Sequence, residues 1–197
     1  LNHFPSISFG VETALADLNN NGERIIFHND FSKGKSSIKI NGLIWMGKSS
    51  FMIDQIKEKI DLGFKCLKIK IGAINFNEEI EIIKSIRNIF SFSDLEIRVD
   101  ANGSFKFKTV LKKLEILSEL KIHSIEQPIR QGQREAMATL CNQSPIPIAL
   151  DEELIGITKL EDKKNLLQTI QPQYLIFKPT LLGGFEACEE WIRLAKP

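Results

Sequence analysis

Hydrophobic and polar positions follow one repeated pattern from about residue 38 onward. A short apolar, β-branched run is followed by turn residues and then by a stretch with apolar side chains at helical spacing. The apolar runs predict strands at Ile38–Met46, Cys66–Ile71, Leu95–Val99, Ser124–Glu126, Ile146–Leu150 and Tyr174–Phe177. The stretches between them predict helices at Ser50–Leu62, Asn77–Phe90, Lys106–Leu120, Gln133–Cys141, Thr158–Ile170 and Phe185–Ala195.

The stretch Glu78–Phe90 shows the helical pattern most clearly. Its apolar positions recur at i, i+1, i+4 and i+7, and they are occupied by Ile82, Ile83, Ile86 and Ile89. Residues at this spacing share one side of a helix. We therefore expect an isoleucine face that packs against the sheet.

Strands that alternate with helices of this length are typical of βα units on a parallel sheet, joined by right-handed crossovers. The pattern fits either an open doubly wound sheet or a closed (β/α)8 barrel. No G-x-G-x-x-G follows a predicted strand and no G-x-x-x-x-G-K-[ST] occurs, which disfavours the open sheet. A complete barrel needs about 250 residues. Because residues 38–197 hold six units, we expect strands seven and eight to lie outside this chain.

Residues 1–37 follow a different pattern. Pro5–Leu18 is predicted to be one helix, whereas Asn19–Gly22 and Asn29–Ser37 are loop-like and rich in Asn, Gly, Ser and Lys. We expect residues 1–37 to be the tail of another domain with a linker, and residues 38–197 to be the partial barrel.

Charge balance and cysteine content exclude several function classes. The 26 basic and 25 acidic side chains leave a formal charge of +1, which offers no positive field to nucleic acid or to an anionic membrane. No apolar run approaches the roughly 18 residues of a membrane span. Cys66, Cys141 and Cys188 form no C-x-x-C pair, so we expect free thiols and a cytoplasmic protein.

Charged residues end five consecutive predicted strands. They are Lys70, Asp100, Glu126, Asp151 and Lys178, at intervals of 30, 26, 25 and 27 residues, or about one βα unit each. We expect these side chains at equivalent positions on neighbouring strands. In a parallel barrel such strand ends meet at one mouth, where active sites lie. Surface ion pairs are the alternative, but five charges in register favour a shared site.

Three of these residues are acids and two are bases. Asp100, Glu126 and Asp151 would form an oxygen-only site, which suits a hard cation such as magnesium, with manganese as an alternative. Lys70 and Lys178 flank the acids in the strand order. A lysine beside a divalent cation and a second lysine loses its proton more readily and can act as a base. Metal and base together are what removal of a proton α to a carboxylate requires.

These residues lie within the motifs Lys68-x-Lys70, Asp100-Ala101-Asn102, Glu126-Gln127-Pro128, Asp151-Glu152 and Lys178. In order and spacing the motifs resemble those of the enolase superfamily, in its muconate-cycloisomerase-like subgroup. The likeness covers nearly the whole chain from Ile38, and Phe9–Leu18 is similar to the helix that leads into the barrel from the family's capping domain. The resemblance implies a (β/α)8-type barrel of that superfamily, here incomplete.

The resemblance also implies roles for the site residues. Asp100, Glu126 and Asp151 would bind magnesium. Lys70 would take the α proton and help a hydroxyl group leave. Lys178 would stay protonated and stabilise the enediolate from the other face.

Further residues have supporting roles in the resemblance. Lys68 would give electrostatic support near the base, and Asn102 and Glu152 would orient ligands or a lysine. Trp45 is expected to line the pocket from strand one. The pair Gly183-Gly184 would bring backbone N–H groups close to a substrate carboxylate, or else only form a turn that needs glycine.

Within the subgroup, Asn41–Trp45, Leu150–Gly156 and Lys178–Gly184 are most similar to lyases that dehydrate a cyclohexadiene carboxylate in menaquinone biosynthesis. The expected partner is therefore a small carboxylate substrate. The same catalytic residues would serve a dipeptide epimerase, an N-acylamino acid racemase or a muconate cycloisomerase. An inactive barrel fragment is a further alternative. The oligomeric state is not predicted.

Overall fold

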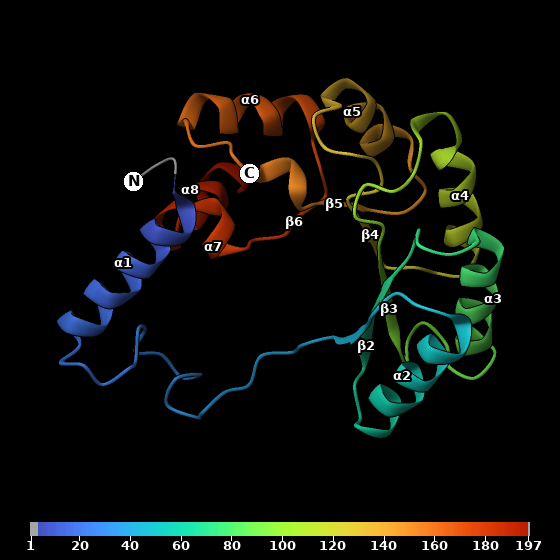
Figure 1. Ribbon diagram of the computed structural model, residues 1–197, viewed down its shortest axis with the longest axis horizontal. Helices are drawn as coiled ribbons and strands as arrows, with labels where there is room; N and C mark the ends of the chain where they lie inside the picture. The colour runs from blue at the N-terminus through green and yellow to red at the C-terminus, as the bar shows by residue number, and fades with distance from the viewer. Residues whose placement is uncertain (1–3, 197) are drawn as a thin grey trace. The chain divides into compact units, whose positions relative to one another are not determined.

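The computed structural model describes residues 4–196, and its secondary structure alternates between strands and helices from β1 to α8 (Figure 1). Residues 1–3 of the predicted first segment and residue 197 of the predicted barrel lie outside the described residues. The strands are β1 (Gly42–Ile44), β2 (Cys66–Lys70), β3 (Glu96–Asp100), β4 (Ser124–Glu126), β5 (Ile148–Leu150) and β6 (Tyr174–Leu175). The longer helices are α1 (Pro5–Asn19), α2 (Ser49–Asp61), α3 (Phe76–Arg87), α4 (Phe107–Glu119), α5 (Arg134–Gln143), α6 (Leu160–Ile170) and α8 (Phe185–Ala195). Two short helices, η1 (Glu152–Leu154) and α7 (Pro179–Leu182), complete the described chain.

The strand order confirms the barrel-type fold. Within the described chain, the sheet runs β1-β2-β3-β4-β5-β6, and every neighbouring pair is parallel. A doubly wound sheet would instead reverse its strand order at a switch point. Successive strands that lie side by side are the arrangement of a (β/α)8 barrel, and six of its units are present.

The end strands are shorter than the sequence predicts. β1 covers Gly42–Ile44 of the predicted Ile38–Met46, and β6 covers Tyr174–Leu175 of the predicted Tyr174–Phe177. The reason is that a strand ends where its pairing with the neighbouring strand ends, whereas the apolar run in the sequence continues beyond the paired residues. The short helices η1 and α7 were not predicted, because neither is long enough to show a helical period.

One face of the sheet forms the core. Helices α2, α3, α4 and α5 lie along the same side of the sheet (Figure 1). The sheet residues that point toward them are fully buried; they are Leu67, Ile69, Ile97, Val99, Ile125 and Ile148. The predicted isoleucine face of α3 is buried at Ile82, Ile83 and Ile86. Ile89 was wrongly placed on that face: α3 ends at Arg87, so Ile89 leaves the helical direction and is 75% exposed.

The chain divides into two compact units. The sheet unit contains Ile40–Glu153 and Thr169–Leu175, and the helical unit contains the described part of Leu1–Lys39 together with Leu154–Gln168 and Ile176–Pro197. Within the helical unit, α1 packs on α7 and α8. The hydroxyl of Ser6 donates to the backbone oxygen of Thr180 at 2.8 Å, and the rings of Phe9 and Phe185 meet edge to face. A domain boundary at residue 37 stays a prediction.

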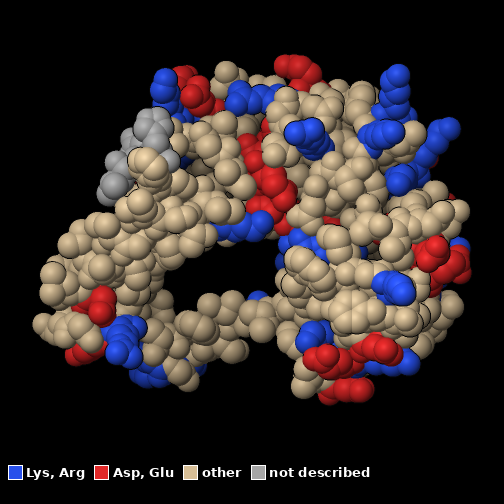
Figure 2. Space-filling view, in the orientation of Figure 1, with Lys and Arg blue, Asp and Glu red and all other residues tan. Residues whose placement is uncertain are grey.

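The surface carries charges of both signs, as the near-equal numbers of basic and acidic residues predict. Basic and acidic side chains both occur on the visible helices, and neither sign covers the face shown in Figure 2. None of the helices in residues 4–196 is long and apolar enough to cross a membrane. All three cysteines are free. Burial raises the pKa of the Cys141 thiol to about 12. A cytoplasmic location stays a prediction.

Truncation of Leu114 tests the packing of α4 on the sheet. Leu114 is fully buried, and Leu114→Ala should lower the free energy of unfolding by about 2–5 kcal/mol because it leaves a cavity. Urea denaturation of the complete protein measures this change. The matched control is Ile116→Ala on the same helix, where the side chain is 39% exposed. The control should cost clearly less, because part of the Ile116 side chain already lies in water in the folded state, and equal losses for the two variants would contradict the described packing.

Candidate active site

Strand register sets the functional face of the sheet. Parallel pairing aligns Lys70 with Asp100, and Asp100 with Glu126. Because side chains alternate between the two faces of a strand, these three form one row on the face opposite the apolar core. Lys68 lies two residues before Lys70 in β2 and shares that face. The structure therefore brings together four of the side chains that the sequence singles out.

Lys68 connects the two acids of this row. Its Nζ donates to Oε2 of Glu126 at 2.6 Å and lies 2.9 Å from Oδ2 of Asp100. Nζ of Lys70 donates to the same Oδ2 atom at 2.6 Å. Two ammonium groups thus face two adjacent carboxylates, and the charge of Lys68 is shared between both acids.

The crowding of charge shifts the pKa values of this cluster. Burial, followed by the charge of Asp100, raises the pKa of Glu126 to about 7. Burial would also raise the pKa of Asp100, but its hydrogen bond from Lys70 and the charge of Lys68 outweigh burial and hold that pKa below its usual range. Burial acts to lower the pKa of Lys68, yet the two carboxylates raise it above the usual value. Glu126 is therefore the acid whose charge is least well compensated.

A chain of hydrogen bonds orients Lys70. Its Nζ donates to Oδ1 of Asn102 at 2.7 Å, in addition to its bond with Asp100. Nδ2 of Asn102 donates in turn to Oε1 of Glu152 at 2.9 Å. Asn102 has a φ of 43°, in the left-handed region that asparagine tolerates better than most residues. Asn102 and Glu152 thus contact the lysine side of the site, directly and through one another.

Trp45 lies directly after β1 and is 53% exposed. Nζ of Lys70 lies 5.7 Å from its ring centroid, within the range of a cation–π contact. Gln55 of α2 fixes the Trp45 backbone, because its Oε1 accepts from the N–H at 2.9 Å and its Nε2 donates to the carbonyl oxygen at 3.0 Å. An exposed indole is thus held beside the lysine. Its contact with a substrate stays a prediction.

Asp151 is buried one residue beyond the end of β5. The pairing of β4 with β5 aligns Glu126 with Ala149. Asp151 therefore lies two residues past the row formed by Lys70, Asp100 and Glu126, and the expectation of equivalent positions is wrong for Asp151. The reason is the stagger of neighbouring strands in barrel-type sheets, which equal chain intervals do not reveal.

Three predicted residues belong to the helical unit. Lys178 immediately precedes α7, and Gly183-Gly184 joins α7 to α8 with φ values of 108° and 110°, which favour glycine. Glu12 of α1 accepts hydrogen bonds from the backbone N–H groups of Phe185 and, at 2.9 Å, Glu186. A side chain of the chain itself therefore caps α8. A contact between this glycine turn and a substrate stays a prediction.

The three acids have the donor chemistry that a hard divalent cation prefers. All of their donor atoms are oxygen, and Oε1 of Glu126 is buried without a hydrogen-bond partner. The Lys68 ammonium lies within 2.9 Å of both Asp100 and Glu126, so this part of the site already holds a positive charge between two carboxylates. Among the described residues, no group of three or more His, Cys, Asp or Glu side chains has the geometry of a metal site. Asp100, Glu126 and Asp151 thus stay the predicted ligands.

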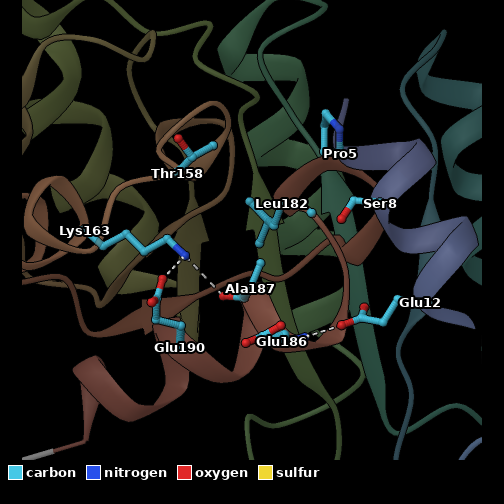
Figure 3. Close-up of a pocket in the computed structure, with 10 residues that line it drawn as sticks. Pro5, Ser8, Glu12, Thr158, Lys163, Leu182, Glu186, Ala187 and Glu190 are labelled. Atoms are coloured by element: carbon cyan, nitrogen blue, oxygen red, sulfur yellow. Dashed lines mark hydrogen bonds and ion pairs between the residues drawn. The ribbon is translucent and has the colours of Figure 1, made fainter. Parts of the chain in front are cut away.

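A separate cavity of about 330 Å³ lies in the helical unit. It is lined by residues of α1, α6, α7 and α8 (Figure 3). Lys163, which is 2% exposed, pairs there with Glu190, and Glu12 reaches from α1 toward the start of α8. Of the predicted site residues that the structure describes, only Gly183 lines this cavity.

Sequence reasoning gave no role to three buried polar side chains near the strand ends. Oε1 of Glu79 accepts from the N–H of Gly72 at 2.6 Å and holds the loop that follows β2. Gln127 and Glu153 are hydrogen-bonded to each other at 3.3 Å. Gln127 lies inside the motif Glu126-Gln127-Pro128, and Glu153 directly follows the motif Asp151-Glu152. Their position next to predicted site residues could have pointed to them. Glu79 lies on a predicted helix with no such signal.

Comparison with known proteins supports the same fold. Residues 52–196 match the family model described as Enolase C-terminal domain-like. An o-succinylbenzoate synthase from Desulfotalea psychrophila is 50% identical over 193 residues, which cover 98% of this chain and 52% of that protein. An arabinonate dehydratase from Saccharolobus solfataricus is 31% identical over 144 residues, which cover 71% of this chain and 38% of that protein. The chain thus spans about half the length, or less, of these curated relatives.

Solved structures give the same result. The crystal structure of MenC from Desulfotalea psychrophila has a TM-score of 0.90 and 49% identity, and the match covers 98% of this chain and 53% of that one. A muconate cycloisomerase from Pseudomonas fluorescens has a TM-score of 0.76 and 25% identity, with coverage of 95% and 52%. The likeness is therefore both in sequence and in the path of the chain.

The raised pKa of Glu126 predicts how stability depends on pH without metal. An unfolded glutamate has a pKa of about 4.3, whereas Glu126 in the folded protein has one of about 7. The folded state binds more protons between these values, so the free energy of unfolding should rise as the pH falls from about 8 to about 5. Urea denaturation in the presence of a chelator measures this slope.

Substitution of Glu126 isolates its share of that slope. Glu126→Gln should give a flatter dependence than the unchanged protein, since it removes the group that gains a proton. Glu115→Gln on the exposed side of α4 is the control and should leave the slope unchanged. Equal slopes for Glu126→Gln and the unchanged protein would show that Glu126 is not the titrating group.

Proposed function

The chain belongs to the enolase C-terminal domain-like family of the enolase superfamily, and on that premise we propose that the complete protein is a magnesium-dependent o-succinylbenzoate synthase. In this proposal it is a lyase of menaquinone biosynthesis that dehydrates 2-succinyl-6-hydroxy-2,4-cyclohexadiene-1-carboxylate to o-succinylbenzoate. The row of Lys70, Asp100 and Glu126 across three parallel strands carries the proposal, because it would place a base beside a cation site.

Asp100, Glu126 and Asp151 would hold the magnesium ion. Bound there, the ion would supply positive charge next to the substrate carboxylate as its α proton is removed. The adjacent buried carboxylates of Asp100 and Glu126 support this assignment, because the pKa of Glu126, raised to about 7, shows that its charge is incompletely compensated. Lys68 would move its ammonium group away from the shared position and remain near the base as electrostatic support.

Lys70 would act as the base. Asp100 and Asn102 hold its ammonium nitrogen at 2.6 and 2.7 Å, and the exposed Trp45 ring lies 5.7 Å from it. A base must reach the proton that it removes, and a fixed lysine at the end of β2 meets that need. The same group would then return the proton to the departing hydroxyl.

Lys178 would stay protonated and stabilise the negative charge that develops on the substrate. It directly precedes α7 in the helical unit. Aromatisation of the ring favours the elimination, so the residues need only stabilise one anion and place one base.

Sequence identity and coverage favour the lyase assignment over the epimerases of the superfamily. The relative named o-succinylbenzoate synthase matches nearly the whole chain at 50% identity. A hydrophobic dipeptide epimerase from Enterococcus faecalis matches 75% of the chain at 25% identity. Two lysines would serve a proton exchange at one carbon equally well, so the catalytic groups alone do not separate the reactions.

A direct assay tests the proposed reaction. The complete protein with magnesium should remove the diene absorbance of the substrate, and a chelator should stop this change because the acids lose their cation. Addition of magnesium should restore it. If the diene assay is flat while a dipeptide or an N-acylamino acid is racemised, the lyase assignment is wrong and an epimerase or racemase replaces it.

Substitution of Lys70 tests the base. Lys70→Ala should lower kcat by about 10²–10⁴-fold, since general base catalysis contributes that much, and circular dichroism should show an unchanged fold. Lys84→Ala is the control, because Lys84 is an exposed lysine on α3 whose ion pair with Glu81 lies on the helix surface. Near-normal turnover by Lys70→Ala would assign the base to another residue.

A further inference from the structure

Gln127 lies at the carboxyl end of β4, directly after Glu126, and its side chain is 0% exposed. Its φ of 39° falls in the left-handed region. A residue with a Cβ keeps that conformation only where its surroundings fix it, and such positions cluster at functional sites. The strain therefore directs attention to what Gln127 contacts.

The Gln127 amide uses its full hydrogen-bonding capacity. Its Oε1 accepts from the backbone N–H groups of Asp151 and Glu153, both at 3.2 Å. Its Nε2 donates to the backbone oxygen of Ile129 at 3.1 Å and to Oε2 of Glu153 at 3.3 Å. A side-chain amide offers two donors and two acceptor sites. The amide thus holds both ends of the segment Asp151–Glu153.

The Gln127 backbone reaches the neighbouring strands on both sides. Its N–H donates to the oxygen of Ala149 at 2.9 Å, and its carbonyl oxygen accepts from the N–H of Gly103 at 2.7 Å. Gly103 follows Asn102, the residue that accepts a hydrogen bond from Lys70. One residue therefore connects the turns that follow β3, β4 and β5.

Glu153 completes the connection from the other side. It is buried, and its two carboxylate oxygens accept from the N–H of Gly132 at 3.1 and 3.2 Å. Gly132 has a φ of 84° and belongs to the loop after β4. Glu153 therefore holds the loop that follows β4, and Gln127 holds the turn that follows β5. The two side chains are also hydrogen-bonded to each other.

We propose that Gln127, with Glu153 as its buried partner, is the positioning residue of the active site. It sets the turn that carries Asp151 and, through Gly103, the turn that carries Asn102. The relative placement of the magnesium ligands and of the group that orients Lys70 then depends on one amide. A neutral amide does this without adding charge beside two carboxylates and two lysines. The proposal rests on the proposed function in that Asp151 is taken as a magnesium ligand.

Removal of the amide is the first test. Gln127→Leu in the complete protein removes the oxygen that accepts from the N–H groups of Asp151 and Glu153, so the turn loses these two bonds. The Mg²⁺ affinity, measured by isothermal titration calorimetry, should fall by about 10–100-fold. At saturating Mg²⁺, kcat should fall while the KM for the substrate changes by less than about twofold, because the Gln127 side chain is fully buried and offers no surface to a substrate.

A reciprocal pair of substitutions separates positioning from general packing. Gln127→Glu places a second buried carboxylate against Glu153 and should weaken Mg²⁺ binding. In the double variant that also carries Glu153→Gln, the amide at position 153 donates to the carboxylate at position 127, the reverse of the original hydrogen bond. Most of the lost Mg²⁺ affinity should then return. Gln173→Leu is the control: Oε1 of Gln173 accepts from the N–H of Ile148 at 2.8 Å, at the other end of β5. It should leave the Mg²⁺ affinity unchanged.

The proposal is overturned if folded Gln127→Leu binds Mg²⁺ as tightly as the unchanged protein. If Gln127→Leu does not fold, the reciprocal pair decides, and a double variant that recovers no affinity overturns the proposal. The titration needs no substrate. A protein that fails the diene assay but shows these changes in Mg²⁺ affinity refutes the proposed reaction and supports the positioning role.

Discussion

Two carboxylates buried side by side impose the main constraint on this protein. Asp100 and Glu126 end neighbouring parallel strands, and register places them in one row. Adjacent buried charges of one sign are costly unless positive charge lies between or beside them. Lys68 and Lys70 supply that charge from the next strand, at 2.6 to 2.9 Å. The arrangement of the mouth follows from this need for compensation.

The sheet can present such a cluster because its other face is fully apolar. Alternate residues of β2, β3 and β4 are buried under the helices, so the polar residues between them have to point to the opposite side. Packing of α2 to α5 therefore fixes the direction of every site side chain on these strands. The apolar core lies on one face and the predicted site on the other, and both share the same strand backbone.

Hydrogen bonds at the strand ends fix the turns that follow the strands, which strand pairing alone does not position. Asn102 and Gln127 both adopt left-handed backbone conformations at the point where their strands stop. Each uses a side-chain amide to bond residues that are distant in the sequence, Asn102 to Glu152 and Gln127 to Asp151. Neutral amides can cross-link adjacent turns without disturbing the balance of charge. The backbone strain is thus offset by bonds that define the site.

The sequence by itself determined the barrel-type order of units and the row of Lys70, Asp100 and Glu126, because periodicity and unit length are local properties of the chain. It did not determine that Asp151 lies past this row, since stagger between strands is set only when they pair. Nor did it reveal the sharing of Lys68 between two acids or the hydrogen bonds of Gln127. Such contacts join residues that only the tertiary structure brings within bonding distance.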